Sequence, residues 1–114
     1  MADCLFCKIA AGTIPVKRVA ESEHALAFPD INPQAPTHVL VIPKKHLVSL
    51  NEVEAADWPI LGQVHALVAE VAKKTGLAQT GFRTVINTGK DANQIVFHVH
   101  VHVIGGRQLG WPPG

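Results

Sequence analysis

The chain has 114 residues, a length that fits one domain, and 47% of them are hydrophobic, which is enough for a core. Its formal net charge is only +1 and its lysines and arginines are scattered, which argues against a protein that binds a nucleic-acid backbone. It has neither a run of 18 apolar residues nor a basic-then-apolar N-terminus. We therefore expect a single cytoplasmic domain over residues 1–114 that binds no membrane.

The first element that the sequence predicts is a short helix over residues 4–11. Asp3 precedes it as a candidate N-cap, and Gly12 follows it as a residue that readily ends a helix. Cys4 and Cys7 are three positions apart and fall on one side of such a helix. Two cysteines this close suit a metal site or a redox pair better than a disulfide between distant segments.

Three strands follow in the first half of the chain. Residues 16–21 and 24–28 predict two strands joined by a tight turn. Residues 37–42 are rich in β-branched side chains and predict a buried strand, which Pro43 ends. The intervening residues 30–36 contain two prolines, so we expect an irregular loop there.

The second half predicts one long helix and two further strands. Between Pro59, which a first helical turn tolerates, and Gly76, which can end the helix, apolar residues recur at helical spacing. They are Ile60, Leu61, Val64, Leu67, Val68 and Val71. Residues 82–87 and 95–104 predict strands on either side of a loop. This order indicates an α+β domain with an antiparallel sheet of about five strands and helices on one face.

Three histidines, His98, His100 and His102, alternate with valines in the last predicted strand. Because the side chains of a strand point to opposite faces in turn, the imidazoles share one face and the valines share the other. Three histidines together favour proton transfer, nucleophilic attack or metal binding near neutral pH. In a straight strand His98 and His102 lie about 13 Å apart, so only adjacent pairs could bind one ion. The alternative is three solvent-facing histidines at a sheet edge.

Attack on phosphorus is one chemistry that these histidines permit. The attacking ring needs one nitrogen free and the other held by an acceptor such as a backbone carbonyl. An amine leaving group needs a proton, which a second imidazole on the same face could donate. Backbone N–H groups of the loop at residues 88–94 could hold the charge of the phosphate.

Several segments resemble one protein family. Residues 98–104 resemble the His-φ-His-φ-His-φ-φ motif of the histidine triad (HIT) superfamily, where φ is an apolar residue. Residues 30–38, 41–46 and 105–114 resemble its Hint branch, the purine nucleoside phosphoramidate hydrolases. The resemblance covers nearly the whole chain. It implies a HIT-like fold, a homodimer, and cleavage of the P–N bond of purine nucleoside 5′-phosphoramidates without a catalytic metal.

The resemblance also implies roles for single residues. His100 would attack the α-phosphorus and carry the nucleotide until water releases the nucleoside monophosphate. His102 would contact the phosphate and the leaving group, while His98 and His38 would position the nucleophile. Asp30 would accept hydrogen bonds from the ribose hydroxyls; a core role for His38 and a plain surface role for Asp30 are the alternatives. The other implied nucleotide-binding residues are Phe6, Ile9, Ile31, Asn87, Gln94 and Ile95.

One residue departs from the Hint pattern. Hint proteins commonly have a serine just before the triad, whereas this chain has Ile95. The isoleucine side chain has no hydroxyl to offer a phosphate or a leaving nitrogen, although its backbone N–H can still donate. We therefore expect slower turnover or an altered leaving-group preference within the same class of reaction.

The cysteine pair predicts a second site. Tetrahedral zinc is often held by two thiolates and two histidines. Some bacterial relatives with this cysteine pair bind zinc, and by resemblance to them the ligands would be Cys4, Cys7, His46 and His98. Such a zinc would be structural and would tie the N-terminal helix to the sheet. Two ordinary buried cysteines are the alternative.

Other functions remain open at this point. A dinucleoside polyphosphate hydrolase is the neighbouring branch of the superfamily, but the C-terminal Trp-Pro-Pro-Gly resembles Hint instead. A module that binds purine nucleotides without hydrolysing them is a second alternative, which Ile95 favours. A zinc-held nucleic-acid binder lacks the basic face and the interleaved aromatic residues that such proteins use.

Overall fold

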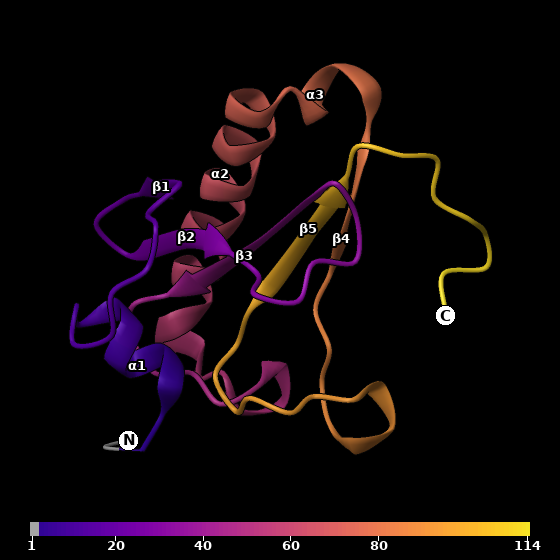
Figure 1. The fold of residues 1–114 in the computed structure, drawn as a ribbon. Helices are drawn as coiled ribbons and strands as arrows, with labels where there is room; N and C mark the ends of the chain where they lie inside the picture. Colours follow the sequence, from indigo (N-terminus) through magenta and orange to yellow (C-terminus); the bar gives the residue numbers. More distant parts are fainter. Residues whose placement is uncertain (1–2) are drawn as a thin grey trace.

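The protein is built on a five-stranded antiparallel sheet with the strand order β1-β2-β3-β5-β4 (Figure 1). The computed structural model describes residues 3–114. Its elements are α1 (Leu5–Ala10), β1 (Ala20–Glu21), β2 (Ala25–Pro29), β3 (Thr37–Pro43), α2 (Trp58–Thr75), α3 (Leu77–Thr80), β4 (Phe82–Val85) and β5 (Val101–Gly105). The predicted α+β class, with one long and one short N-terminal helix, is confirmed.

The long helix α2 covers one face of the sheet. Its buried residues recur every three or four positions, which gives the helix one apolar face. This face packs against alternate residues of the central strands, such as Val41 of β3 and Val103 of β5, which are fully buried. The predicted helix ends are close to the observed ones: Pro59 lies in the first turn, and Gly76 ends the helix with a left-handed φ of 82°.

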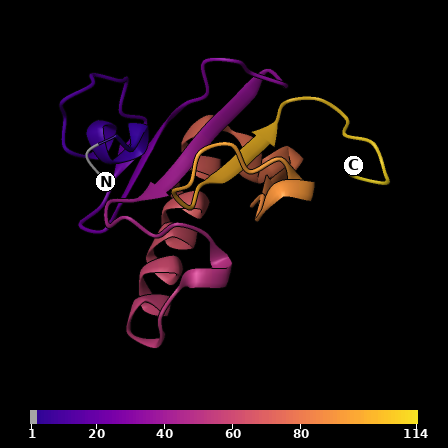
Figure 2. The ribbon, with the colours of Figure 1, turned by 90° about the horizontal axis from the view of Figure 1, so that it is seen from below.

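The short helix α1 lies on the other face of the sheet (Figure 2). Phe6 and Ile9 of α1 are buried against Phe28, Leu40 and other residues of β2 and β3 that point away from α2. The expectation of helices on one face was therefore wrong. Six residues are too few to show the period of a buried face. The face of the sheet that α1 covers could therefore not be predicted from its sequence.

The start of α1 also differs from the prediction. Cys4, not Asp3, is the N-cap, and its sulfur accepts a hydrogen bond from the backbone N–H of Cys7 at 3.4 Å. A cysteine is an uncommon cap, and its use here places both sulfur atoms at the same end of the helix. Both cysteines are therefore held at the N-terminal end of α1.

The histidine strand is shorter than residues 95–104. Pairing of β5 with β3 runs from Gly105 only to Val101, so His98 and His100 precede the strand. Before Val101 the chain no longer pairs with β3 but contacts the segment that follows β3. There the backbone N–H of Val99 donates to the carbonyl of Leu47 at 2.6 Å. The alternation nevertheless continues: Val99 packs against α2, and His98 and His100 contact Phe6 on the opposite side.

Two other strands are shorter than predicted, because each has a partner on one side only. β1 covers two residues of the predicted 16–21, and β4 covers four of the predicted 82–87. The short helix α3 was not predicted. No helix within residues 3–114 is both long and apolar enough to cross a membrane.

Candidate active site

A pocket of about 470 Å³ lies between α1, the loop after β2 and the segment that leads into β5. One part of its lining is apolar and includes Phe6, Ile9 and Phe28. The polar part includes Asp30, His38, Asn87, His100 and His102. The pocket thus brings together residues from distant parts of the chain, an apolar region beside a group of imidazoles.

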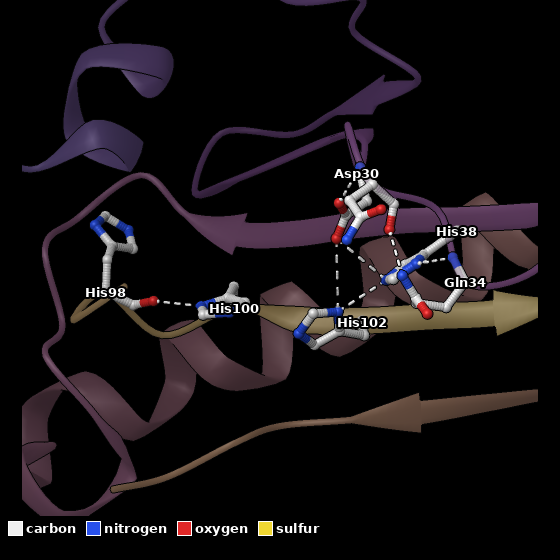
Figure 3. A network of polar contacts seen from close by, with 7 residues as sticks. Asp30, Gln34, His38, His98, His100 and His102 are labelled. Carbon is white, nitrogen blue, oxygen red and sulfur yellow. Dashed lines mark hydrogen bonds and ion pairs between the residues drawn. The ribbon is translucent and has the colours of Figure 1, made fainter. Parts of the chain in front are cut away.

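His100 is held through one nitrogen of its ring. Its Nδ1 lies 2.8 Å from the carbonyl oxygen of His98 (Figure 3). A carbonyl oxygen only accepts, so Nδ1 is the donor, and the lone pair of the neutral ring is on Nε2. The ring also contacts the edge of Phe6, with ring centroids 5.1 Å apart. His100 therefore offers a nitrogen lone pair in a fixed orientation, as a nucleophile requires.

His102 and His38 form a second unit with Asp30 (Figure 3). Nε2 of His38 lies 2.9 Å from Nδ1 of His102 and 3.3 Å from Oδ2 of Asp30. The rings of His102 and His100 are neighbours, with centroids 5.1 Å apart. Burial, and then the neighbouring His100 and His38, lower the pKa of His102 to about 4, while Asp30 acts in the opposite direction. His102 is therefore neutral near pH 7 when the pocket is empty.

His98 does not reach the pocket and belongs to a separate cluster with Cys4, Cys7 and His46. Nδ1 of His98 lies 3.4 Å from Cys4 Sγ, 3.6 Å from Cys7 Sγ and 3.3 Å from His46 Nδ1. Nδ1 of His46 lies 3.2 Å from Cys7 Sγ. Zinc with bonds of about 2.0–2.3 Å to nitrogen and sulfur in a tetrahedron separates its ligand atoms by about 3.3–3.8 Å, so these residues fit that ion.

The hydrogen bonds of His98 leave it ready to bind a metal. Its Nε2 donates to the carbonyl of Pro43 at 2.8 Å, so the lone pair is on Nδ1, which faces the sulfur atoms. Burial, and then the neighbouring His46 and His100, lower the pKa of His98 to about 4, which keeps the ring neutral. Burial and Cys4 raise the pKa of the Cys7 thiol to about 11, so binding of a metal would have to displace its proton.

The cysteine cluster and the Asp30, His38 and His102 group are the two sets of possible metal ligands found within residues 3–114. His100 is in neither, which argues against the alternative of a metal at the middle histidine. His98 orients His100 through its backbone, because its carbonyl accepts a hydrogen bond from the ring of His100.

Comparison with known proteins identifies the family. The HIT domain family matches residues 11–109 of the chain. The chain belongs to the HIT domain family. A 13.2 kDa HIT-like protein of Azospirillum brasilense is 52% identical over 93% of this chain and 88% of its own length. Protein HitA of Neisseria gonorrhoeae is 49% identical over 92% of this chain and 97% of its own length.

Solved structures resemble this HIT domain closely. A HIT family hydrolase of Legionella pneumophila is 47% identical and has a TM-score of 0.94, covering 98% of this chain and 100% of its own. A histidine triad protein of Clostridium difficile is 44% identical with a TM-score of 0.93, covering 96% of both chains. The expected HIT-like fold is confirmed.

The HIT domain places most of the implied nucleotide-binding residues on the pocket, but not Gln94. Phe6, Ile9, Asp30, Ile31, Asn87 and Ile95 all line it. Gln94 is buried instead: its amide donates to the carbonyl of Val48 at 2.8 Å, and its Oε1 accepts from the backbone N–H of Gly89 at 3.0 Å. The Gln94 side chain therefore does not line the pocket as the resemblance implied, because its amide connects the loop to the segment after β3.

Asn93 and Gln34 are among the pocket residues of the HIT domain that the sequence did not predict. Asn93 lines the pocket in a left-handed conformation with φ of 61°, which asparagine tolerates better than most residues. Gln34 also lines the pocket, and its backbone N–H donates to Nδ1 of His38 at 3.0 Å. A backbone donor leaves no mark on the identity of a residue, so only the structure reveals it.

Proposed function

We propose that the protein is a hydrolase that cleaves the P–N bond of purine nucleoside 5′-phosphoramidates through a nucleotide held covalently on His100. The observation that carries the proposal is the orientation of His100, whose Nδ1 donates to the His98 carbonyl and leaves Nε2 as the nucleophile. Similarity to a protein named a HIT family hydrolase supports the class of reaction.

The lining of the pocket supports a nucleotide as the substrate. The apolar region, which includes Phe6 and Ile9, suits the two faces of a purine, with Ile31 fully exposed at the rim as a third contact. Asp30 is a carboxylate that can accept hydrogen bonds from the ribose hydroxyls through the capacity that Asn32 and His38 leave. With the purine and the ribose bound in this way, the α-phosphorus would lie near the rings of His100 and His102.

The reaction that follows has two steps. In the first, Nε2 of His100 forms a bond to the α-phosphorus, the P–N bond breaks, and the amine leaves with one added proton. In the second, a water oxygen attacks the phosphorus, the bond to Nε2 breaks, and the nucleoside monophosphate is released. Asn87 and the loop before His98 line the pocket, and the side-chain amide and backbone N–H groups there are our candidates for stabilising the phosphate charge.

A rapid-quench experiment in alkaline denaturant tests this proposal. Adenosine 5′-phosphoramidate labelled at phosphorus is mixed with the wild type, with His100→Ala, and with His65→Ala as a control whose histidine is exposed on α2. We expect acid-labile label on the wild type and on His65→Ala, and none on His100→Ala, whose turnover falls by at least about 1,000-fold. Undiminished cleavage by His100→Ala would contradict the proposal.

Two substrate comparisons separate the competing functions. Faster cleavage of a diadenosine polyphosphate than of the phosphoramidate would favour the dinucleoside polyphosphate hydrolases. Tight binding of AMP with cleavage near the uncatalysed rate would favour a nucleotide-binding module. The proposed nucleophile, the neighbouring imidazole and the apolar region of the pocket suit either hydrolase. We place hydrolysis of phosphoramidates first because the C-terminal Trp-Pro-Pro-Gly resembles Hint.

The proposal includes a structural zinc ion held by Cys4, Cys7, His46 and His98. The donor set and the spacing of its atoms fit tetrahedral zinc, as described above. When bound, zinc would fix α1 to the segments that carry the two histidines, and it would take no part in the chemistry at His100. The catalytic steps therefore require no metal.

The proposal also includes a homodimer. β4 is at one edge of the sheet, and Phe82 on it is 40% exposed, a combination that favours pairing with another chain. Light scattering should give twice the 12.2 kDa mass of one chain. Phe82→Glu should reduce that mass to the monomer value, whereas Phe97→Glu, at an exposed phenylalanine outside β4, should not.

A further inference from the structure

Hydrogen bonds of the loop after β2 fix where the hydrogen of His38 lies. The backbone N–H of Gln34 points at Nδ1 of His38 at 3.0 Å, and the His38 side chain is only 3% exposed. A nitrogen that accepts a hydrogen bond from an N–H carries no hydrogen itself. The single hydrogen of the His38 ring is therefore on Nε2, on the side of His102 (Figure 3).

The hydrogen on His38 Nε2 in turn fixes the ring of His102. Nδ1 of His102 is 2.9 Å away and must act as the acceptor, so the hydrogen of neutral His102 is on Nε2. Within residues 3–114 no hydrogen bond is formed by Nε2 of His102, and this residue lines the pocket. One backbone N–H thus determines, through two rings, that neutral His102 in the empty pocket directs an N–H, not a lone pair, towards the space that a substrate would enter.

We propose that the backbone amide of Gln34 is a positioning group that makes His102, rather than His38, the proton donor to the leaving group. This inference rests on the proposed hydrolase activity. Two imidazoles 2.9 Å apart could exchange an added proton, but a hydrogen on Nδ1 of His38 would oppose the N–H of Gln34. A hydrogen added to Nδ1 of His102 also faces an N–H, that of His38, but the His38 N–H has a second acceptor in Asp30, whereas the Gln34 N–H has none among the described residues. The added proton is therefore on His102.

Asp30 completes the unit. When Nδ1 of His102 takes a proton, the hydrogen on His38 Nε2 needs another acceptor, and Oδ2 of Asp30 lies 3.3 Å from that nitrogen. The charged or titratable side chains beside His102 are then Asp30, His38 and His100, together with the bound phosphate. The negative charge of the phosphate and of Asp30 favours the positive ring.

The proton then moves in a closed cycle. As the bond from His100 Nε2 to phosphorus forms and the P–N bond breaks, the proton on Nε2 of protonated His102 moves to the leaving nitrogen, which leaves His102 neutral with its hydrogen on Nδ1 and a lone pair on Nε2. As water attacks, the O–P bond forms, the bond to His100 breaks, and a proton of the water moves to His102 Nε2. His102 acts first as the general acid and then as the general base.

The structure secures the position of the Gln34 amide. The side-chain amide of Gln34 donates to the carbonyl of Asn32 at 3.0 Å, and the N–H of Asn32 donates to Asp30 Oδ1 at 2.8 Å. Arg107, just after β5, donates to the carbonyl of Gln34 at 3.1 Å. The same amide explains why Asp30, His38 and His102 would resist a metal ion, since the Nε2 of His38 carries a hydrogen instead of a lone pair.

Two variants at one position test the inference. Gln34→Pro removes the backbone N–H, whereas Gln34→Ala keeps it and removes only the side chain. Each is assayed with an alkylamine phosphoramidate of AMP and with the p-nitrophenyl ester of AMP, whose leaving group needs no proton. We expect Gln34→Pro to lose about 10- to 100-fold in kcat on the phosphoramidate and less than about 3-fold on the ester. Gln34→Ala, which keeps the N–H but loses the side chain that helps to hold the loop, should change kcat on the two substrates by the same factor.

The outcomes separate this inference from the proposed function. If the wild type forms no covalent nucleotide and cleaves neither substrate, the proposed function fails. If the wild type is active and Gln34→Pro cleaves both substrates like the wild type, or loses both equally, the inference fails. Nitrogen-15 NMR of the wild type provides a check that needs no variant: hydrogen on Nε2 of both His38 and His102 is expected, and hydrogen on Nδ1 of His38 would overturn the inference.

Discussion

Each histidine with a defined role has one ring nitrogen bound to the backbone or to another histidine. His98 donates to the Pro43 carbonyl, His100 donates to the His98 carbonyl, and His38 accepts from the Gln34 amide. These bonds determine which nitrogen has the lone pair. The same side chain is thereby a possible metal ligand at position 98, the proposed nucleophile at 100 and a hydrogen donor at 38.

Replacement of Ile95 by serine should raise kcat, because it adds one hydroxyl at the pocket. It is 82% exposed on the rim of the pocket and offers the substrate no side-chain hydrogen bond. Ile95→Ser should raise kcat for amine leaving groups by about 3- to 10-fold, the worth of one hydrogen bond in the transition state. Rates measured across several amines check this, with Ile95→Val as the apolar control. Equal rates for both variants would rule out a role for the hydroxyl.

The state of His102 predicts how ligand binding depends on pH. Its pKa is about 4 in the empty pocket, chiefly because of burial, and an adjacent phosphate charge raises it. Binding of the methyl ester of AMP, whose single charge does not titrate near neutral pH, should take up protons at pH 5–6. Its affinity should therefore fall as the pH rises through the pKa of the bound state.

Calorimetry in two buffers with different ionisation enthalpies measures the protons taken up. The control is His102→Asn, which keeps a polar side chain but cannot take the proton, so the uptake should disappear. Uptake that persists unchanged in His102→Asn would assign the proton to another group.

At the level of elements, the sequence predicted what depends on repeated patterns. The helix around Leu61 and Val71 and the strand that Pro43 ends have periodicity and end signals in the sequence, and both are confirmed. The side of the sheet that α1 covers was predicted wrongly, because Phe6 and Ile9 suit either face. Burial against a particular surface depends on contacts between distant segments, which local patterns do not contain.

The candidate site shows the same limit. The alternation of His98, His100 and His102 with valines placed the imidazoles on one side correctly, although only His102 is in β5. The three histidines are divided between two clusters because β3 ends at Pro43. The carbonyl of Pro43 then accepts a hydrogen bond from His98, which lies apart from the pocket. The backbone contacts of Gln34 could not be predicted, since any residue other than proline supplies the same N–H.

The end of β5 packs closely against α3 at Gly105. A Cβ on Gly105 would lie 2.7 Å from Leu77 Cδ2 and 3.2 Å from the carbonyl oxygen of Gly81. Gly105→Ala should lower the free energy of unfolding by about 1–3 kcal/mol. Gly62→Ala is the matched control on α2, where a Cβ meets nothing within 4 Å, and should be neutral or stabilising by up to about 1 kcal/mol. Urea unfolding measures both, and an equal effect of the two would contradict this packing.

At the level of the whole molecule, the cysteine cluster joins three segments that are far apart in the sequence. Cys4 and Cys7 belong to α1, His46 follows β3, and His98 precedes β5. α1 has only six residues and has no place in the sheet, so besides the proposed metal it is held by Phe6, Ile9 and their neighbours. Because Phe6 also lines the pocket and contacts His100, the position of α1 affects the active site.

Removal of the metal should therefore loosen the protein measurably. Protein purified without a histidine tag or chelator should contain one zinc per chain, and a chelator should lower Tm by about 10 °C or more. Cys7→Ala and His46→Ala should each lose the zinc and show the same low Tm, although they lie on different segments and leave the Cys4 cap in place. His65→Ala should keep the zinc and the Tm of the wild type. His38→Ala should also keep the zinc, because we expect the cluster of Asp30, His38 and His102 to bind none. A second zinc per chain, or zinc retained by His46→Ala, would show that these ligands are assigned wrongly.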